Sequence, residues 1–427
     1  MSWRTIVVAA AFLFSVIKVY PYQPLTLLTA ADTAGVPREI EDPQCIGINK
    51  EPAHATLMPY DNLPKALAAN RHASGFCRSL NGKWKFNYVS WPQQRPKDFY
   101  LPSFNVDGWK EIDVPSNWQI KGYGNPYYSN YTYIFQKDFP HVMSTPPVDW
   151  TAYKERNPVG SYRRDFDLPA NWAGRRVVVC FDGVDAGFFL WVNGQKVGYS
   201  VNSRNAAEFD ITDKVRRGKN IIAVEVYRFT VGSYLEDQDM WRLSGIFRNV
   251  TLYSTPMCRI RDLSISTSLD AQYKDAVLKT VAKIKNDGPD AMQPGRLSVD
   301  LYDGEKPAGN GSVEVPGLQP GEEKVLTVQM SVKAPKKWTA ETPYLYTTVL
   351  TLNKDQKSTE IVSAKTGFRT IEVRGRRFLI NGVPVKLKGV NRHENWPDDG
   401  HAITEEQMVR DIVLIKQANC NHVRTCH

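Results

Sequence analysis

Short runs of alternating apolar and polar residues, bounded by Gly, Pro, Asn and Asp, dominate the chain from Leu80 to Phe368. Such runs are typical of β-strands joined by tight turns, and helical spacing is rare among them. Residues 188–192 and 195–199 flank Asn193-Gly194, the dipeptide favoured for a two-residue type I′ turn. The pattern therefore predicts a mainly β protein.

The 427 residues are enough for about three domains. Residues 77–256 contain many short strand-like runs at even spacing, which predicts a jelly-roll β-sandwich. Residues 257–369 have the length and the Gly/Pro punctuation of an immunoglobulin-like β-sandwich. Residues 31–76 have many Pro and polar residues without sustained periodicity, so we expect an extended segment that wraps on the first sandwich.

The pattern changes at about residue 370, where a hairpin is followed by a strand, a helix and a second strand. Residues 386–390 are the predicted first strand, Thr404 and Gln407 form a capping box for a helix to about Ala418, and residues 421–426 are the second strand. This is one repeat and the start of the next in a (β/α)8 TIM barrel. Residues 370–427 therefore predict the incomplete start of a catalytic barrel, with an exposed helix face.

The amino terminus has the pattern of an export signal. Arg4 precedes an apolar run from Ile6 to Ile17, which Lys18 interrupts. The run is short for a membrane-spanning helix and fits the n-region and h-region of a secretory signal. We therefore predict a signal peptide over residues 1–30, a periplasmic or extracellular protein, and no stable membrane insertion after cleavage. An uncleaved anchor and a cytoplasmic protein are the alternatives.

Charge and cysteine content exclude several classes of protein. The formal net charge of +9 is small for this length, its basic residues are scattered, and no nucleic-acid-binding module occurs, so no nucleic-acid partner is predicted. Six cysteines in a chain of this length do not make a disulfide scaffold, and no Cys-x-x-Cys pair indicates zinc.

Histidines concentrate near the end of the chain, where His393, His401, His422 and His427 all lie in the last 35 residues. Imidazoles at strand ends can hydrogen-bond a polyol. A metal site is the rival interpretation, but no His-x-x-x-His spacing occurs. His393 and His427, just past the ends of the two predicted strands, are the candidates for function, and His422 is interpreted as structural.

Carboxylates give two further signals. Glu236, Asp237 and Asp239 repel one another unless a cation, an Arg or sugar hydroxyls compensate them, so this segment is either a solvated loop or a binding loop. Glycoside hydrolysis usually needs two placed carboxylic acids. Glu394 is the only carboxylate well placed beside the first predicted barrel strand, so a catalytic pair is missing.

Four long motifs occur in one order along the chain from about Leu80 to His427. They closely resemble the large bacterial β-galactosidases of glycoside hydrolase family 2, whose layout of jelly roll, immunoglobulin-like domain and (β/α)8 barrel agrees with the segments above. The motifs are Val114-Pro115-Ser116-Asn117-Trp118-Gln119, Tyr128-Ser129-Asn130-Tyr131-Thr132-Tyr133, residues 232–248 and Gly389-Val390-Asn391-Arg392-His393-Glu394.

The resemblance implies a retaining enzyme that hydrolyses terminal non-reducing β-D-galactose residues in lactose-like substrates or glycans. Both catalytic glutamates of such an enzyme are expected beyond residue 427, so the chain carries no catalytic residue and is expected to be inactive alone. A β-glucuronidase or β-mannosidase of the same family is an alternative. A non-catalytic carbohydrate-binding protein is another.

The resemblance also implies substrate-binding residues. Asn130 resembles an asparagine that a jelly-roll loop brings to the active site, and Asp239 an aspartate that binds galactose hydroxyls and sodium. His393 and His427 resemble sugar-contacting histidines after the first two barrel strands, and Arg424 a residue that supports the charge network. The full-length family enzyme uses Mg²⁺ and Na⁺, with the magnesium ligands expected beyond this chain. A homo-oligomer of the full-length protein stays open.

Overall fold

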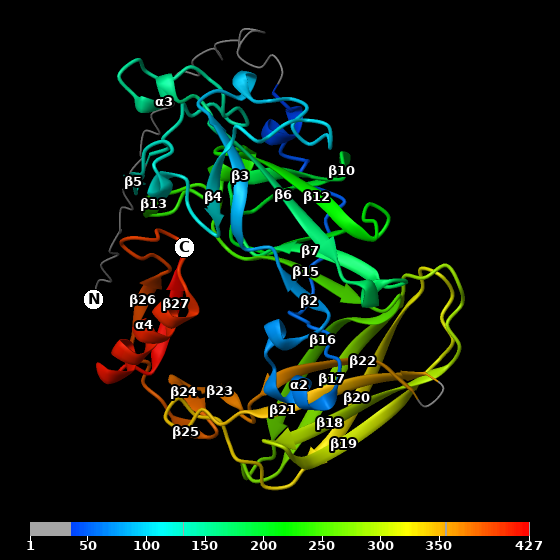
Figure 1. Cartoon of the computed structure of the whole chain (residues 1–427). Coiled ribbons are helices and arrows are strands. Elements are labelled where there is room, and N and C mark those ends of the chain that lie inside the picture. The colour runs from blue at the N-terminus through cyan, green and yellow to red at the C-terminus, as the bar shows by residue number, and fades with distance from the viewer. Residues whose placement is uncertain (1–35, 131, 355–356, 427) are drawn as a thin grey trace, which may run out of the picture.

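The computed structural model describes residues 36–130, 132–354 and 357–426. The predicted signal peptide and His427 lie outside the described residues. Two β-sandwiches and a strand–helix–strand unit follow one another along a curve in Figure 1, with the first sandwich at the top, the second at the bottom right and the unit at the left. The mainly β prediction is confirmed.

The first sandwich consists of a seven-stranded antiparallel sheet, in the order β1-β10-β9-β12-β6-β3-β4, and a four-stranded sheet, in the order β11-β7-β15-β2. The predicted strand runs of this region are all present. The strands are β1 (Gly47–Ile48), β2 (Cys77–Ser79), β3 (Gly82–Val89), β4 (Lys110–Val114), β6 (Val159–Leu168), β7 (Arg176–Phe181), β9 (Gly187–Val192), β10 (Gln195–Val201), β11 (Ala207–Asp210), β12 (Gly218–Tyr227) and β15 (Val250–Thr255).

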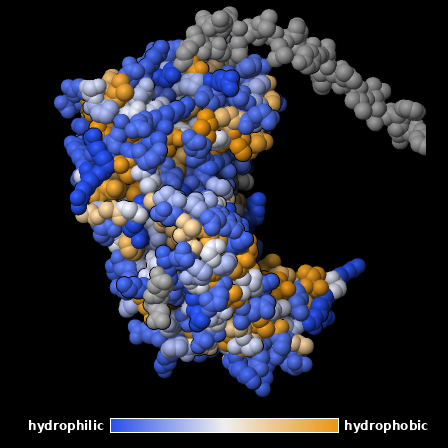
Figure 2. Space-filling model, turned by 90° about the vertical axis from the view of Figure 1, so that its right-hand side faces the viewer, coloured by the Kyte–Doolittle hydropathy of each residue, from blue (hydrophilic) through white to orange (hydrophobic). Residues whose placement is uncertain are grey.

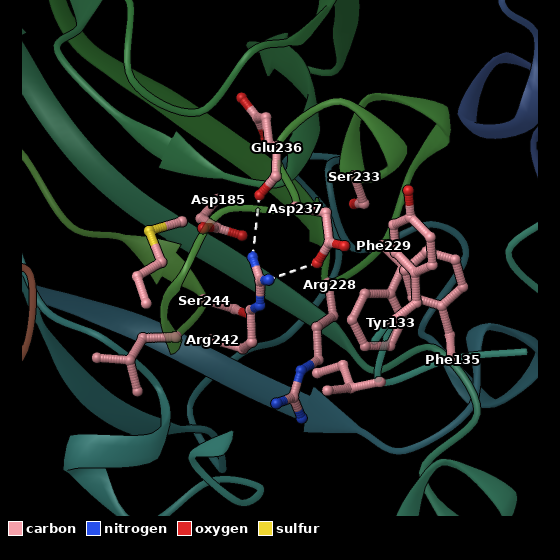
Figure 3. Close-up of a pocket in the computed structure, with 13 residues that line it drawn as sticks. Tyr133, Phe135, Asp185, Arg228, Phe229, Ser233, Glu236, Asp237, Arg242 and Ser244 are labelled. Atoms are coloured by element: carbon pink, nitrogen blue, oxygen red, sulfur yellow. Dashed lines mark hydrogen bonds and ion pairs between the residues drawn. The ribbon is translucent and has the colours of Figure 1, made fainter. Parts of the chain in front are cut away.

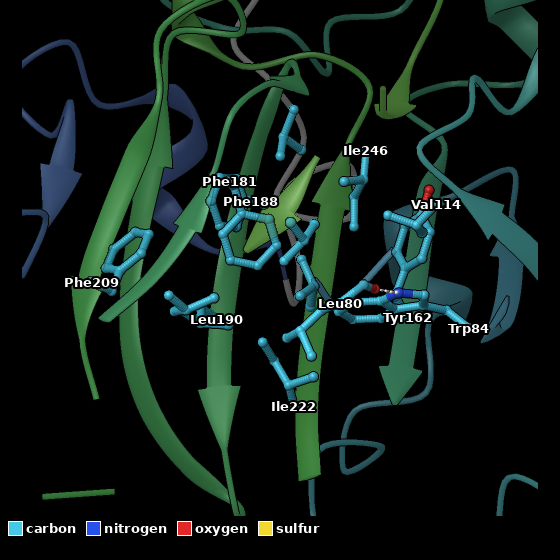
Figure 4. Close-up of a cluster of buried hydrophobic side chains, with 14 of the residues drawn as sticks. Leu80, Trp84, Val114, Tyr162, Phe181, Phe188, Leu190, Phe209, Ile222 and Ile246 are labelled. Carbon is cyan, nitrogen blue, oxygen red and sulfur yellow. Dashed lines mark hydrogen bonds between the residues drawn. The ribbon is translucent and has the colours of Figure 1, made fainter. Parts of the chain in front are cut away.

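The core of this sandwich lies between the two sheets, as Figure 4 shows for its central side chains. Alternate residues of a strand face opposite sides of a sheet. Phe188 and Leu190 of β9 and Ile222 of β12 accordingly point into the core, where they pack with Phe181 of β7. The neighbouring Phe189 points to the other side, where it belongs to a second buried cluster, so both faces of the large sheet are covered.

The turn between β9 and β10 has the predicted geometry. Asn193 and Gly194 have φ angles of 51° and 84°, which are the positive values that a type I′ turn requires at both central positions. The Asn193 side chain also donates a hydrogen bond of 2.8 Å to the carbonyl oxygen of Lys214. This hairpin sets the register of the central strands.

Residues 36–76 carry more structure than their sequence predicts. Gly47 and Ile48 form β1, which pairs with the edge strand β10 of the large sheet. A short helix, α2 (Leu63–Ala68), packs toward the second sandwich, where Ser363 donates a hydrogen bond of 2.6 Å to the Ala66 carbonyl oxygen. The segment therefore wraps on both sandwiches. The sequence did not predict α2, because a helix of six residues is too short to give a periodic signal, although it buries Ala66.

The second sandwich has a three-stranded sheet, β16-β17-β20, and a four-stranded sheet, β19-β18-β21-β22. Seven antiparallel strands in two sheets are typical of an immunoglobulin-like domain. Leu278, Leu297 and Leu350 lie in its closed core. The strands are β16 (Cys258–Leu269), β17 (Ala276–Asn286), β18 (Gly295–Asp303), β19 (Lys306–Val315), β20 (Glu323–Val332), β21 (Tyr346–Lys354) and β22 (Lys357–Thr366).

A small sheet of β23 (Ile371–Arg374), β24 (Arg377–Ile380) and β25 (Val383–Pro384) leads into the last unit. There β26 (Gly389–His393) pairs in parallel with β27 (His422–Cys426), and α4 (Glu405–Gln417) connects them. Thr404 and Gln407 form the predicted capping box. The predicted first strand, 386–390, was placed too early, because β27 offers no ladder partner before His422, which pairs with Gly389.

The surface of the last unit differs from that of the sandwiches. Figure 2 shows a mainly hydrophilic face with scattered apolar patches. On α4, by contrast, Val409 and Leu414 are 55% and 56% exposed, and Ile412 and Val413 beside them are also exposed, as the sequence predicts. Among the described residues, no helix has the length and apolar character needed to cross a membrane.

Candidate functional site

A two-stranded ribbon of β5 (Tyr127–Ser129) and β13 (Met240–Arg242) brings together residues that are far apart in the sequence. Trp241 lies opposite Tyr128 in its antiparallel register. Asn130 directly follows β5 and Asp239 directly precedes β13, so both lie at the same end of this antiparallel ribbon. Tyr128 and Trp241, directly opposite in the register, face the same side of the ribbon, and Asp239 reaches that side through its contact with Tyr128. Two residues singled out from the sequence, Asn130 and Asp239, are therefore neighbours.

The side chains of this face interact with one another. The Tyr128 hydroxyl donates a hydrogen bond to Asp239 Oδ1, and this bond raises the pKa of Tyr128. The Tyr128 and Trp241 rings meet edge to face, with centroids 5.6 Å apart and planes at 71°. Both rings are open to solvent, with exposed fractions of 56% and 42%. Exposed aromatic rings beside a carboxylate suit the apolar face and the hydroxyls of a sugar.

The three carboxylates of the acidic segment each have a separate partner. Asp237 forms an ion pair with Arg242, which also donates a hydrogen bond of 3.0 Å to the carbonyl oxygen of Glu236, as Figure 3 shows. The Glu236 side chain accepts hydrogen bonds of 2.6 and 2.7 Å from the backbone and the hydroxyl of Ser203. Asp239 is thereby left as the carboxylate that faces outward on the ribbon, and the segment is a braced loop.

A small pocket of about 40 Å³ lies behind this loop, and Figure 3 shows the residues around it. Asp185, at the end of β8 (Val184–Asp185), lines it beside Arg228 and Arg242. The pKa of Asp185 is raised to about 7, because the effect of burial outweighs the opposing effect of the nearby Arg204 charge. The pocket has room for about one water molecule and is therefore too small for a sugar.

A larger cavity of about 220 Å³ lies between the first sandwich and the last unit. The aromatic face of the ribbon forms one wall, and the carboxyl ends of the parallel strands β26 and β27 form another. In a barrel, this strand end is where substrates bind. The lining residues are Tyr128, Arg204, Met240, Trp241, Phe247, Arg248, His393, Glu394, Asn395, His401 and Cys426.

Charged side chains fix the second wall of the cavity. Glu394, directly after β26, accepts a hydrogen bond of 2.9 Å from Arg248, which follows β14 (Gly245–Ile246) of the first sandwich. Arg392 lies 3.5 Å from the other oxygen of Glu394 and binds Asp411 of α4 at 2.8 Å. Glu394 is thus held by two guanidinium groups.

The structure places the residues singled out from the sequence as follows. His393 lines the cavity, whereas Asn130 and Asp239 are outside the set of described residues that line it. Asp239 accepts a hydrogen bond from the lining residue Tyr128, and Asn130 directly follows β5 at the same end of the ribbon. Arg424 lies on β27 opposite Asn391, is exposed, and is outside the set of described residues that line the cavity. His427 follows β27, outside the described residues.

Other lining residues were not selected from the sequence as site residues. Tyr128 and Trp241 occur in motifs noted there, and the alternation around Asp239 could have identified them as sharing its face. Arg248 ends the motif 232–248 and His401 belongs to the histidine cluster, but neither was selected, and Arg204 carries no local signal. His401 is fixed to the first sandwich, because its backbone N–H donates to the buried side chain of Asn117 at 2.7 Å.

Metal-binding potential is limited in this part of the molecule. Within the described residues, no group of three or more His, Cys, Asp or Glu side chains could hold a metal ion. Asp239 offers a carboxylate, and Asn130 at the same end of the ribbon offers an amide oxygen. Both are hard donors of the kind that alkali and alkaline-earth cations prefer, but they form only part of a coordination shell.

Comparison with known protein families gives matches over three consecutive segments. Residues 77–256 match the model of the glycosyl hydrolases family 2 sugar binding domain. Residues 258–369 match the model described as glycosyl hydrolases family 2, and residues 371–427 match that of the family 2 TIM barrel domain.

Curated relatives include two β-galactosidases. That of Priestia megaterium is 42% identical over 399 residues, which cover 93% of this chain and 38% of the relative. That of Photobacterium profundum is 41% identical over 396 residues, covering 91% and 37%. The chain thus spans less than two-fifths of the length of these relatives.

Solved structures of similar fold include Bacteroides uniformis β-glucuronidase 2, bound covalently to cyclophellitol-6-carboxylate aziridine. It has a TM-score of 0.68 at 25% identity and covers 82% of this chain and 39% of its own. A glycosyl hydrolase family 2 member from Bacteroides cellulosilyticus has a TM-score of 0.66 at 24% identity, with 82% and 44% covered.

Proposed function

Since the chain belongs to glycosyl hydrolases family 2, we propose that it forms the amino-terminal part of a retaining β-galactosidase. The substrates are lactose-like β-galactosides or glycans with terminal, non-reducing β-D-galactose. The support is the identity of 41–42% with relatives named β-galactosidase across more than nine-tenths of the chain. In this proposal the galactose ring occupies the 220 Å³ cavity.

The observation that carries the proposal is the position of the cavity. It lies between an exposed aromatic face with a carboxylate, on the ribbon, and the strand ends that carry His393. Sugar-binding sites combine an aromatic surface for the C–H face of the ring with polar groups for its hydroxyls. A site between a sugar-binding domain and a barrel also places the sugar against the barrel's catalytic loops.

Each residue then has a defined task. Asp239 accepts hydrogen bonds from sugar hydroxyls, and Asn130 both donates and accepts. His393 hydrogen-bonds a ring hydroxyl near the reacting carbon, and Arg424 and His427 complete the charged surroundings. A retaining reaction needs an acid/base carboxyl and a nucleophilic carboxylate about 5–5.5 Å apart. Glu394, held by two arginines, is not proposed for either role, and both are assigned to residues beyond His427.

Ions have a subordinate place in the proposal. Sodium is proposed beside Asp239, where the carboxylate and the Asn130 amide oxygen would be two of its ligands and would help orient the sugar hydroxyls. Magnesium is proposed for the full-length enzyme, as in the family it resembles. It has no proposed ligand in the described chain, and none of the tasks above depends on it.

The test is hydrolysis by the complete gene product, translated to its own stop codon. Turnover of a chromogenic β-galactoside, at a kcat/KM at least tenfold above that of the matching β-glucuronide and β-mannoside, is the expected result. Preference for either other sugar would overturn the galactosidase assignment. Binding of galactose with no turnover of the β-galactoside, the β-glucuronide or the β-mannoside would favour a carbohydrate-binding protein.

Location and assembly are also proposed. We propose export to the periplasm or the extracellular space with loss of residues 1–30, and a homo-oligomer of the full-length protein. Mass spectrometry of the mature protein from the periplasm and light scattering of the purified enzyme test them. Retention of Met1 in cytoplasmic protein would contradict export.

A further inference from the structure

His401 is a buried polar side chain in the wall of the cavity. It is 6% exposed, and it lines the cavity between Phe247 and His393. Its Nδ1 atom lies 3.4 Å from both terminal nitrogens of Arg204. A guanidinium group can only donate hydrogen bonds, so Nδ1 is the acceptor. The ring proton of the neutral imidazole therefore sits on Nε2.

The surroundings keep this ring neutral. Burial is the main cause that lowers the pKa of His401, to about 3, and the charges of Arg204, Arg248 and His393 act in the same direction. At neutral pH the ring is thus a fixed tautomer with one donor, Nε2–H. Within residues 36–130, 132–354 and 357–426 no hydrogen-bond acceptor contacts Nε2.

The backbone around His401 is fixed as firmly as its ring. Its N–H donates to Asn117 Oδ1 at 2.7 Å, and Asn117 is fully buried. The preceding Gly400 has a φ of +59°, and a Cβ atom there would lie 2.7 Å from Asn117 Oδ1. The imidazole also meets the Phe247 ring edge to face, with centroids 6.0 Å apart. The donor is therefore preorganised.

Buried donors nearly always have a partner. Arg204 occupies Nδ1, the described residues offer no acceptor to Nε2, and the ring lines the cavity in which the sugar is proposed to bind. We infer that His401 is a sugar-binding residue, whose Nε2–H donates a hydrogen bond to a hydroxyl or ring oxygen of the pyranoside in the cavity. The inference rests on the proposed function for its ligand class and adds a specificity-determining contact to that site.

Two substitutions in the complete gene product separate binding from packing. His401→Phe keeps a planar ring against Phe247 and removes both nitrogens. His401→Gln keeps an acceptor for Arg204 and a donor for the sugar. We expect His401→Phe to raise the inhibition constant of galactose and the KM of a β-galactoside about three- to tenfold, with a much smaller change in kcat. His401→Gln should stay within about twofold of the wild type, as one retained hydrogen bond requires.

Two readouts exclude a purely structural role. The effect of His401→Phe on the inhibition constant should be the same from about pH 5.5 to 8, because the pKa of His401 lies near 3. In ¹⁵N-histidine spectra of the wild type, the Nε2–H resonance should shift when galactose is added. An unchanged inhibition constant in His401→Phe, or an Nε2–H resonance insensitive to every sugar tested, would overturn the inference and leave a water molecule as the partner.

The two proposals fail in distinguishable ways. If the wild-type protein hydrolyses no β-galactoside but its His401 resonance shifts with glucuronic acid or mannose, the galactosidase assignment fails and the role of His401 stands. If the wild type hydrolyses β-galactosides and His401→Phe binds galactose equally well, the role of His401 fails alone. Melting temperatures of both variants within a few degrees of the wild type exclude misfolding as the cause of a change.

Discussion

Arg248 donates a hydrogen bond of 2.9 Å to Glu394, and this contact joins a loop of the first sandwich to the residue that follows β26. A second bond of Arg248, 2.8 Å long, holds the carbonyl oxygen of Arg204. The Arg248 guanidinium therefore fixes both Glu394, which is next to His393, and Arg204, which orients His401. The two walls of the cavity are positioned relative to each other by charge as well as by packing.

Removing this ion pair should affect sugar binding more than stability. Both side chains are 34% exposed, so the pair should contribute only about 0.2–1 kcal/mol to the free energy of unfolding. Arg248→Gln and Glu394→Gln, alone and combined, should each raise the KM of a β-galactoside in the complete gene product, because His393 loses its fixed neighbour. Strictly additive effects of the two substitutions on KM in a double-mutant cycle would show that the contact is irrelevant.

Asp239 should contribute more to sugar binding than any other ribbon residue. A hydrogen bond to a charged group is worth about 1.5–3 kcal/mol, so Asp239→Asn should lower kcat/KM for a β-galactoside about 10- to 150-fold. Tyr128→Phe is the matched control, because it removes the hydroxyl that binds Asp239 but keeps the ring against Trp241. We expect that variant to lose less than tenfold. Equal losses in both variants would mean that Asp239 acts only through Tyr128.

Features with a local cause were predictable from the sequence. The turn at Asn193-Gly194 follows from two residues that tolerate positive φ, and the start of α4 follows from the capping pair Thr404 and Gln407. The strands of both sandwiches follow from alternation within runs of five to ten residues. Predictions that rest on residues close together in the sequence, with no contact to a distant segment, were therefore correct.

Features that depend on distant partners were not predictable. The start of β26 is set by its pairing of Gly389 with His422, which residues 386–390 do not encode. The tautomer of His401 depends on Arg204, 197 positions away, and its position depends on Asn117, 284 positions away. Pairing of the Glu236–Asp239 carboxylates with Ser203, Arg242 and Tyr128 likewise decides between a solvated loop and a braced one.

The junction of the two sandwiches is a buried ion network, and breaking it should uncouple them. Arg259 of β16, 4% exposed, binds Asp287 of the second sandwich at 2.8 Å, and Arg176 of β7 in the first sandwich lies 3.7 Å from the same carboxylate oxygen. Arg259→Met removes one hydrogen-bonded cation from Asp287, which keeps Lys285 at 2.8 Å, so the substitution should cost about 1–3 kcal/mol. Calorimetry should then show a lower first transition that separates from the second.

A matched control lies on the same sandwich. Arg296 of β18 pairs with Glu314 at 2.7 Å, but both side chains are largely exposed, at 58% and 72%. Arg296→Ala should therefore change the free energy of unfolding by at most about 1 kcal/mol and leave one cooperative transition. Equal destabilisation by Arg259→Met and Arg296→Ala would contradict a special role for the junction.

The attachment of residues 51–57 should weaken as the pH rises. His54 Nε2 lies 2.8 Å from Glu208 and Nδ1 lies 2.7 Å from the Ala55 carbonyl oxygen, so both ring nitrogens face acceptors and the imidazolium satisfies both. The hydrogen bond to Glu208 is the main cause that raises the pKa of His54 above 6.5, although burial and the charge of Arg259 oppose it. The same bond helps to lower the pKa of Glu208 against the effect of burial.

The sign of the effect follows from linkage. A histidine with a raised pKa in the folded state contributes stability that is fully present below its unfolded pKa, about 6.5, and is lost as the pH rises through the folded value. Amide exchange of residues 51–57, corrected for its intrinsic pH dependence, should therefore show protection falling as the pH rises above about 6.5 and through the raised pKa of His54, while the core strands β9 and β12 keep theirs. His54→Gln should remove the dependence, because glutamine does not titrate. A pH dependence that survives in His54→Gln would assign the effect to another group.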